Sequence, residues 1–224
     1  MQIIARIHTD FASKFGVPRQ SGLIDSLTAT IVFEEPYRVA EAFRGLDDFS
    51  HIWILWQFSE AVRETWSPTV RPPMLGGNTR MGVFATRSPF RPNPIGPSCV
   101  ELKAVEFIKD LGPVLHVAGA DLMDGTPIYD IKPYLAYTDS RPDATGGFTN
   151  HILDRAVQVE CPAELLQIIP ADKQQALLDI LASDPRPTYQ NDPERVYGFG
   201  FAGYEIGFTV NKKTLTVVSV SKGD

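Results

Sequence analysis

The chain has only two cysteines and no long apolar run. Cys99 and Cys161 form no Cys-x-x-Cys pair, which argues against a thiolate zinc site. We interpret both as buried thiols in a reducing compartment. No apolar run reaches the roughly 20 residues that a transmembrane helix needs. The opening residues, MQIIARIHTDF, also lack the apolar core of a signal peptide. These absences predict a cytoplasmic protein without a membrane span.

Positive charge is also scarce in the chain as a whole, but one segment is basic. The net charge is −6 over 224 residues, which argues against coating of nucleic acid by bulk charge. Residues 61–100 nevertheless contain five arginines and one glutamate, a local charge of +4, which leaves −10 for the rest. A basic segment in an acidic chain favours a local phosphate-binding surface. Hydrophobic residues at 43% and charged residues at 21% exclude a disordered chain.

A Rossmann fold is not expected, because no Gly-x-Gly-x-x-Gly follows a predicted strand and no β-α-β alternation appears in residues 1–140. Runs rich in β-branched and aromatic residues instead predict strands at 3–9, 27–33, 52–58, 98–108 and 114–120. One short helix is predicted near residues 37–45. Short strands with Gly/Pro-rich connections predict a mainly β fold with a single-sheet β-barrel in the N-terminal part.

The second half of the chain predicts a separate small α+β domain. Residues 141–155 form a polar, Gly-rich linker between a barrel domain at 1–140 and this domain at 156–224. Apolar residues at helical spacing predict a helix over 171–183. Two β-rich runs separated by Asn-Lys-Lys predict a hairpin near the end. A unit this small is marginally stable alone, so we expect it to pack on the barrel or on a partner.

The most unusual segment is residues 80–96, RMGVFATRSPFRPNPIG. Its prolines stiffen the loop, and the guanidinium groups of Arg87 and Arg91 suit phosphate or carboxylate. The alternative is a rigid surface loop whose arginines pair with nearby acids. Trp66 and Phe90 lie among these arginines, where they could stack on bases or pack in the core.

Two further polar segments are candidate binding loops. Residues 121–134, DLMDGTPIYDIKPY, carry acids around a Gly-Thr-Pro turn: Asp121, Asp124 and Asp130. These carboxylates could face a cationic or hydroxyl-bearing ligand, or simply form an Asx turn. They match no metal motif, so no metal is predicted. Residues 15–22, FGVPRQSG, present the long polar side chains of Arg19 and Gln20.

Together these segments resemble the TrmO family, also called YaeB or TsaA-like. The resemblance rests on FGVPRQ at 15–20, the 80–96 block and DGTPIYDIKPY at 124–134. It extends over most of the chain through FSHIWILWQF (49–58), WSPTVRPPMLGG (66–77), DPRPTYQ (184–190) and YGFGFAGYEIGFTV (197–210). It implies a non-Rossmann, homodimeric tRNA methyltransferase with a β-barrel catalytic domain. The implied reaction uses S-adenosylmethionine to methylate N6 of N6-threonylcarbamoyladenosine at tRNA position 37, in the anticodon arm.

The resemblance also implies a cofactor site. Its residues carry over by motif onto Pro18, Arg19, Gln20, Ser59, Glu60, Arg87, Pro97, Asp121, Leu122, Met123 and Asp124. Ser59 and Glu60 depart from the residues of other members, so only a backbone contact is implied there. Leu122 and Met123 would pack on the adenine ring.

The implied reaction needs a group that accepts the N6 proton. Asp124 or Asp130 is the candidate base, although either could instead bind a cofactor hydroxyl. Arg87 would hold the carboxylate of the cofactor or of the threonyl group. Phosphates of tRNA are assigned to Arg71, Arg80 and Arg91. Two other functions remain open: a non-catalytic RNA-binding module, and a methyltransferase acting on a small molecule or a protein.

Overall fold

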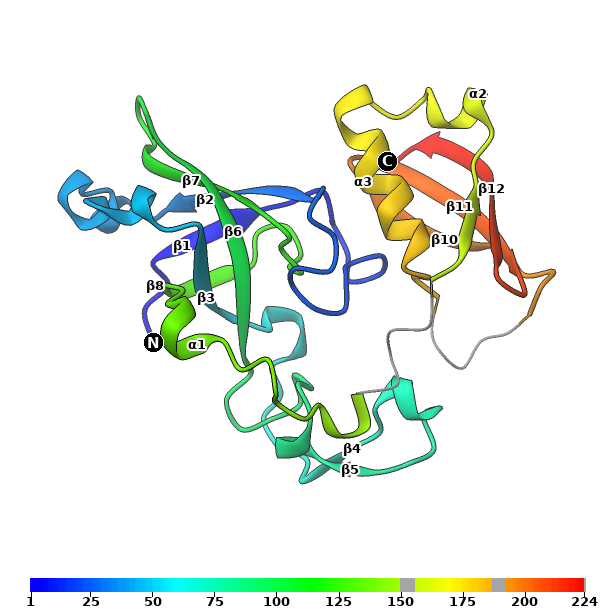
Figure 1. Cartoon of the computed structure of the whole chain (residues 1–224), viewed down its shortest axis with the longest axis horizontal. Coiled ribbons are helices and arrows are strands. Elements are labelled where there is room, and N and C mark those ends of the chain that lie inside the picture. Colours follow the sequence, from blue (N-terminus) through cyan, green and yellow to red (C-terminus); the bar gives the residue numbers. More distant parts are fainter. Residues whose placement is uncertain (150–155, 187–191, 224) are drawn as a thin grey trace.

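The computed structural model describes residues 1–149, 156–186 and 192–223. Its N-terminal part is a closed barrel of six strands in the order β1-β2-β7-β6-β3-β8, every neighbouring pair antiparallel (Figure 1). The strands are β1 (Ala5–His8), β2 (Thr28–Phe33), β3 (His51–Gln57), β6 (Ile95–Ile108), β7 (Gly112–Ala118) and β8 (Pro127–Pro133). The predicted single-sheet barrel is therefore confirmed.

The barrel forms because its strands alternate between apolar inward and mixed outward residues. In β3, Ile52, Ile54 and Trp56 are buried, whereas the residues between them are only partly covered. Alternate side chains of a strand point to opposite faces, so this pattern fills one core. The five strands predicted in this part are confirmed to within a few residues. β8 was missed, since its sequence, PIYDIKP, was interpreted as part of a loop.

The helix predicted near residues 37–45 is wrong. That region forms short 3-10 turns instead: η1 (Glu35–Tyr37), η2 (Ala40–Phe43) and η3 (Leu46–Asp48). Of the residues in these turns only Phe43 is buried, so no continuous apolar stripe stabilises an α-helix. Gly45 has a φ of 79° but precedes η3, where it redirects the chain rather than ending a helix.

The connection from β3 to β6 leaves the barrel as an extended arm (Figure 1). This arm holds η4 (Ser59–Ala61), β4 (Thr69–Val70), η5 (Pro73–Leu75), β5 (Met81–Gly82) and η6 (Val83–Ala85). The two short strands pair antiparallel, and Val83, which directly follows β5, is buried. The arm therefore presents most of the basic segment outside the barrel core.

The C-terminal unit is a four-stranded sheet with helices, in the order β10-β11-β12-β9. Its strands are β9 (Gln158–Glu160), β10 (Tyr197–Phe201), β11 (Tyr204–Asn211) and β12 (Thr214–Lys222), and its helices are α2 (Ala163–Leu166) and α3 (Ala171–Ala182). The predicted helix and hairpin are confirmed. A further short helix, α1 (Ala136–Asp139), follows β8. Residues 150–155 of the predicted linker and the end of the DPRPTYQ motif (187–190) lie outside the described residues.

The segment between β1 and β2 joins the two units. Phe11, Ile24 and Leu27 are buried in the apolar core of the C-terminal unit rather than in the barrel core. Lys173 on α3 also pairs with Asp10 at 2.6 Å. Packing of the small unit on the N-terminal part is thus observed, as its size predicts.

Two expectations about cysteine and membranes can be compared with the structure. Cys99 and Cys161 are free thiols that are half-buried, so full burial was wrong. Each lies where one side of the residue reaches the surface, which the sequence pattern does not reveal. In the described part of the chain, no helix combines the length and apolar character needed to cross a membrane.

Candidate active site

A cavity of about 740 Å³ lies where β3 ends and β6 begins. Its lining residues come from four segments, which span residues 14–20, 56–63, 86–97 and 121–126. The volume is within the range of sites that hold cofactors or other small molecules. All three polar segments singled out in the sequence therefore meet at one cavity.

The loop at residues 16–22 is held in place by the C-terminal unit. The Arg19 guanidinium donates to the main-chain oxygens of Asp184 at 3.4 Å and Arg186 at 3.2 Å. Gly16 has a φ of 90°, and a Cβ there would overlap Cδ2 of Phe199. Only glycine fits this close approach at that backbone angle. The C-terminal unit thus shapes one wall of the cavity.

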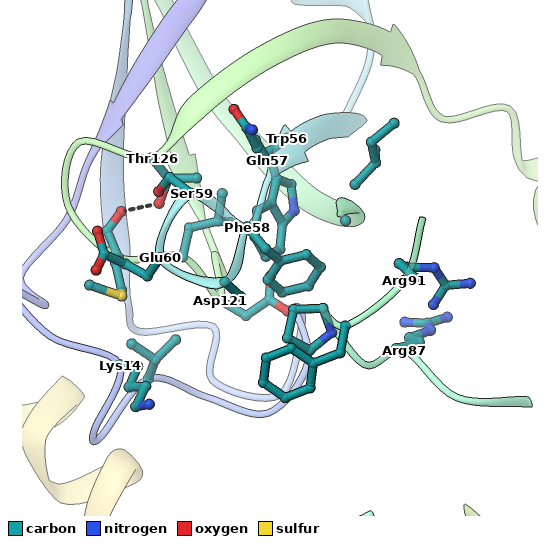
Figure 2. A pocket seen from close by; sticks show the side chains of 18 of the residues that line it. Lys14, Trp56, Gln57, Phe58, Ser59, Glu60, Arg87, Arg91, Asp121 and Thr126 are labelled. Atoms are coloured by element: carbon teal, nitrogen blue, oxygen red, sulfur yellow. Dashed lines mark hydrogen bonds between the residues drawn. The ribbon is translucent and has the colours of Figure 1, made fainter. Parts of the chain in front are cut away.

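Arginines line another wall, as Figure 2 shows for Arg87 and Arg91, which lie together on one side of the cavity. Arg87 donates to the side-chain oxygen of Gln20, which ties the 80–96 block to the 16–22 loop. Arg91 donates to the main-chain oxygen of Thr86 at 2.9 Å. Two guanidinium groups at one wall favour an anionic group of a ligand.

The inner end of the cavity holds a chain of hydrogen bonds. The indole N–H of Trp56 donates to Ser98 Oγ at 2.8 Å, and Ser98 donates to Oδ1 of Asp121 at 2.5 Å. Burial raises the pKa of Asp121 above its ordinary value, and the Ser98 hydrogen bond and the charge of Arg87 offset this only in part. A carboxyl with a raised pKa in a cavity is a candidate for proton transfer.

Beside the Trp56–Ser98–Asp121 hydrogen bonds the cavity has little spare room. A Cβ at Gly96 would lie 2.5 Å from the Trp56 ring, so the β6 backbone approaches the indole closely.

Asp121 and Glu60 are the carboxylates among the described lining residues. In the view of Figure 2, Asp121 lies between Glu60 and Lys14 on one side and the arginines on the other. The Glu60 residue is exposed, whereas Asp121 is half-buried. Asp121 therefore has the more enclosed position.

The implied cofactor residues gather at this cavity with one exception. Ten of them line it: Pro18, Arg19, Gln20, Ser59, Glu60, Arg87, Pro97, Asp121, Leu122 and Met123. Asp124 does not, because its Oδ1 accepts from the Thr9 amide at 3.0 Å and pairs with His8 at 3.2 Å. Asp130, the other candidate base, lies on β8 and pairs with Lys132 at 2.8 Å. Neither candidate base is a lining residue.

The three arginines assigned to tRNA occupy different positions. Arg91 lines the cavity. Arg71 and Arg80 are exposed on the arm, and Arg80 donates to Thr69 Oγ1 at 3.2 Å. Of the two aromatics noted in the sequence, Phe90 lines the cavity beneath the Arg63 guanidinium, 3.8 Å from its ring centroid, whereas Trp66 is exposed.

Several lining residues escaped the sequence analysis, notably Trp56, Phe58 and Thr126. Ser98, which holds Asp121, was also missed. A signal for Ser98 exists in the β6 sequence, because it shares the inward face with Val100 and Leu102. A polar residue at an inward strand position needs a buried partner, which here is Asp121. Within the described residues, no group of three or more His, Cys, Asp or Glu could hold a metal ion.

Comparison with known proteins agrees with this arrangement. The model of the tRNA-methyltransferase O N-terminal domain matches residues 6–140, and that of the TrmO C-terminal domain matches residues 154–223. An Escherichia coli relative named tRNA (adenine(37)-N6)-methyltransferase is 46% identical, covering 85% of this chain and 83% of its own. A Pseudomonas aeruginosa relative named putative S-adenosylmethionine-dependent methyltransferase RcsF is 36% identical, covering 99% and 97%.

A solved structure shows the same similarity over both units. The crystal structure of TrmO from P. aeruginosa superposes with a TM-score of 0.79 at 32% identity, covering 99% of this chain and 95% of that one. The barrel, the C-terminal unit and the sequence segments at the cavity thus all match one family. The chain belongs to the tRNA-methyltransferase O family, and it is a methyltransferase.

Proposed function

We propose that the chain methylates N6 of N6-threonylcarbamoyladenosine at position 37 of tRNA, with S-adenosylmethionine as methyl donor. The observation that carries the proposal is the cavity, which brings a half-buried carboxylate with a raised pKa and two arginines together at one end of the barrel. The name of the E. coli relative supports methylation of adenine 37. The name of the P. aeruginosa relative supports the donor.

The cavity lining fits the proposed donor chemically. Leu122 is 1% exposed, and Met123 and Phe58 add further apolar lining, which suits an adenine ring. Arg87 would hold a carboxylate group of the donor. When bound, the donor supplies an electrophilic methyl group on a sulfonium, so no further activation of that group is needed. The remaining tasks of the protein are alignment and proton removal.

Asp121 replaces Asp124 and Asp130 as the proposed base. The N6 lone pair of a carbamoylated adenosine is delocalised into the ring and the carbonyl, so its proton must leave as the bond forms. Ser98 fixes the Asp121 carboxylate at the inner end of the cavity. A base must reach the proton it removes, and Asp121 alone of the three lines the cavity.

The proposed contact with tRNA follows from the position of the basic arm. We propose that the anticodon arm of tRNA lies across the basic arm, where Arg71 and Arg80 contact phosphates. The protein would act in the cytoplasm as a homodimer, so a second copy could extend the basic surface. The cytoplasmic location and the homodimer rest on the resemblance to the family.

Mass spectrometry of nucleosides tests the proposal directly. Purified protein with S-adenosylmethionine should methylate threonylcarbamoylated tRNA, but not the same transcript without the threonylcarbamoyl group. Methylation of the unmodified transcript at equal rate would contradict the proposed substrate. Calorimetry tests the two alternative functions. An RNA-binding module without catalytic activity would bind tRNA and not the donor. A small-molecule or protein methyltransferase would bind the donor and remain indifferent to tRNA.

Replacing Arg71 or Arg80 by alanine should weaken tRNA binding and reduce its salt dependence. Each lost phosphate contact lowers the slope of log K against log salt by about 0.7–0.9. Filter binding across a salt series measures this slope. Arg44→Ala is a matched control, because Arg44 is exposed on the connection between η2 and η3 and pairs with Glu41. An unchanged slope for both arm variants would remove these arginines from the RNA surface.

A further inference from the structure

Two aromatic side chains of the arm lie exposed against one another. Trp66 is 49% exposed and Phe84 is 72% exposed. Their ring centroids are 5.9 Å apart with an interplanar angle of 30°, a stacked arrangement. Several pairs of Phe, Tyr or Trp rings pack together among the described residues. In this pair alone, both rings are exposed. Adjacent apolar rings left open to water indicate a surface that a partner covers.

The segment that carries the pair is mainly positive. The Arg91 guanidinium lies 6.0 Å from the Phe84 ring centroid, and Arg63 covers the neighbouring Phe90. Glu64 is the only acid in residues 61–100, against five arginines. Aromatic faces among arginines are the combination that binds single-stranded nucleic acid, by stacking with bases and pairing with phosphates.

The pair is continuous with the mouth of the cavity. Arg91 links the two, since it lines the cavity and its guanidinium lies 6.0 Å from the Phe84 ring centroid. Val62, Arg63 and Phe90 also line the cavity from the same arm. A nucleotide inserted into the cavity would therefore place its chain neighbours over this part of the arm.

We propose that Trp66 and Phe84 form a stacking platform for a base next to the nucleotide that is methylated. The proposal rests on the proposed function and specifies how the arm binds the anticodon loop. Loop bases are unpaired and expose their faces, so they can stack on aromatic side chains. A second copy of this chain fits the surface less well. A two-fold contact would bring two arginine-rich arms together.

A fluorescent RNA tests the platform. The probe is an anticodon stem-loop with 2-aminopurine beside the target adenosine, whose emission falls when the base stacks. Trp66→Ala and Phe84→Ala should each weaken binding by roughly 5- to 150-fold and restore emission in the bound state. Trp66→Tyr and Phe84→Tyr should retain most of the affinity. The salt slope should not change, because no charge is removed.

Phe107→Ala is the matched control, because Phe107 is 61% exposed on β6 near the hairpin with β7. Equal affinity of the alanine variants and the native protein would overturn the platform. The platform would also be overturned if the alanine variants sediment as monomers where the native protein sediments as a dimer, and this change accounts for their loss of binding. The assay needs no methyl transfer. Aromatic-dependent binding without methylation would therefore uphold the platform and reject the proposed reaction, and methylation with aromatic-independent binding would do the reverse.

Discussion

The Asp121→Asn variant should lose about 10²- to 10⁴-fold in the rate of methyl transfer, the usual contribution of a general base. The amide oxygen of the substituted side chain would still accept the hydrogen bond from Ser98 that Asp121 accepts at 2.5 Å. The cavity shape should therefore persist while the proton acceptor is lost. Single-turnover methylation gives the rate, and calorimetry with S-adenosylmethionine separates lost turnover from lost binding.

Asp110→Asn is the matched control, because Asp110 is exposed in the turn after β6, with a φ of 72° that asparagine tolerates. It should keep native activity. If Asp124→Asn or Asp130→Asn loses as much turnover as Asp121→Asn, the assignment of the base to Asp121 is wrong. Near-native turnover of Asp121→Asn would lead to the same conclusion.

The raised pKa of Asp121 also fixes the sign of the pH dependence. The base must be ionised, so methyl transfer should fall as pH decreases through a pKa above the ordinary carboxyl range. This limb should be absent in Asp121→Asn. The raised pKa also affects stability. As pH rises, Asp121 ionises in the unfolded chain before it ionises in the folded protein, so the free energy of unfolding falls between the two pKa values. Above the folded-state pKa this loss of stability stays constant. The asparagine variant should then melt no lower than the native protein at neutral pH.

Phe11→Ala should destabilise the whole protein by about 3–5 kcal/mol, the usual cost of truncating a buried phenylalanine. Phe11 is 1% exposed and contacts Phe201, with ring centroids 5.6 Å apart. Because Phe11 comes from the N-terminal part and fills the core of the C-terminal unit, both units should unfold together. Phe107→Ala should change the free energy of unfolding by less than about 0.5 kcal/mol.

Urea denaturation with two probes measures this coupling. All three tryptophans, Trp53, Trp56 and Trp66, lie in the N-terminal part, so their fluorescence follows that part alone. Circular dichroism follows both units. The two curves should coincide and shift together in Phe11→Ala. Separate transitions, with only one shifted, would show that the units are energetically independent.

Enrichment in β-branched and aromatic residues predicted the barrel strands, but it could not predict how the barrel closes. Closure pairs Ala5 with Ile128, and nothing local to either residue specifies that partner. β8 was missed for a related reason: the Gly-Thr-Pro turn before it dominated the interpretation of DGTPIYDIKPY. Strand pairing over such separations depends on the tertiary fold rather than on local propensity.

Motif matching located the cavity but not the direction of each side chain. Asp121 and Asp124 are three residues apart in one loop and face different surroundings. The Asp124 amide donates to the Phe11 main-chain oxygen, and its carboxylate caps the Thr9 amide. Asp121 instead meets Ser98 from β6. These contacts arise only when distant segments pack, so spacing alone could not rank the two aspartates.

The burial of Phe11, Ile24 and Leu27 in the C-terminal unit limits how the protein can be recombined. A chimaera made by joining the barrel of one relative to the C-terminal unit of another at residues 141–155 would separate these side chains from the core they complete. It would also replace the main-chain oxygens that hold Arg19. The exchangeable module is therefore discontinuous, and a working graft should carry residues 10–27 together with the C-terminal unit.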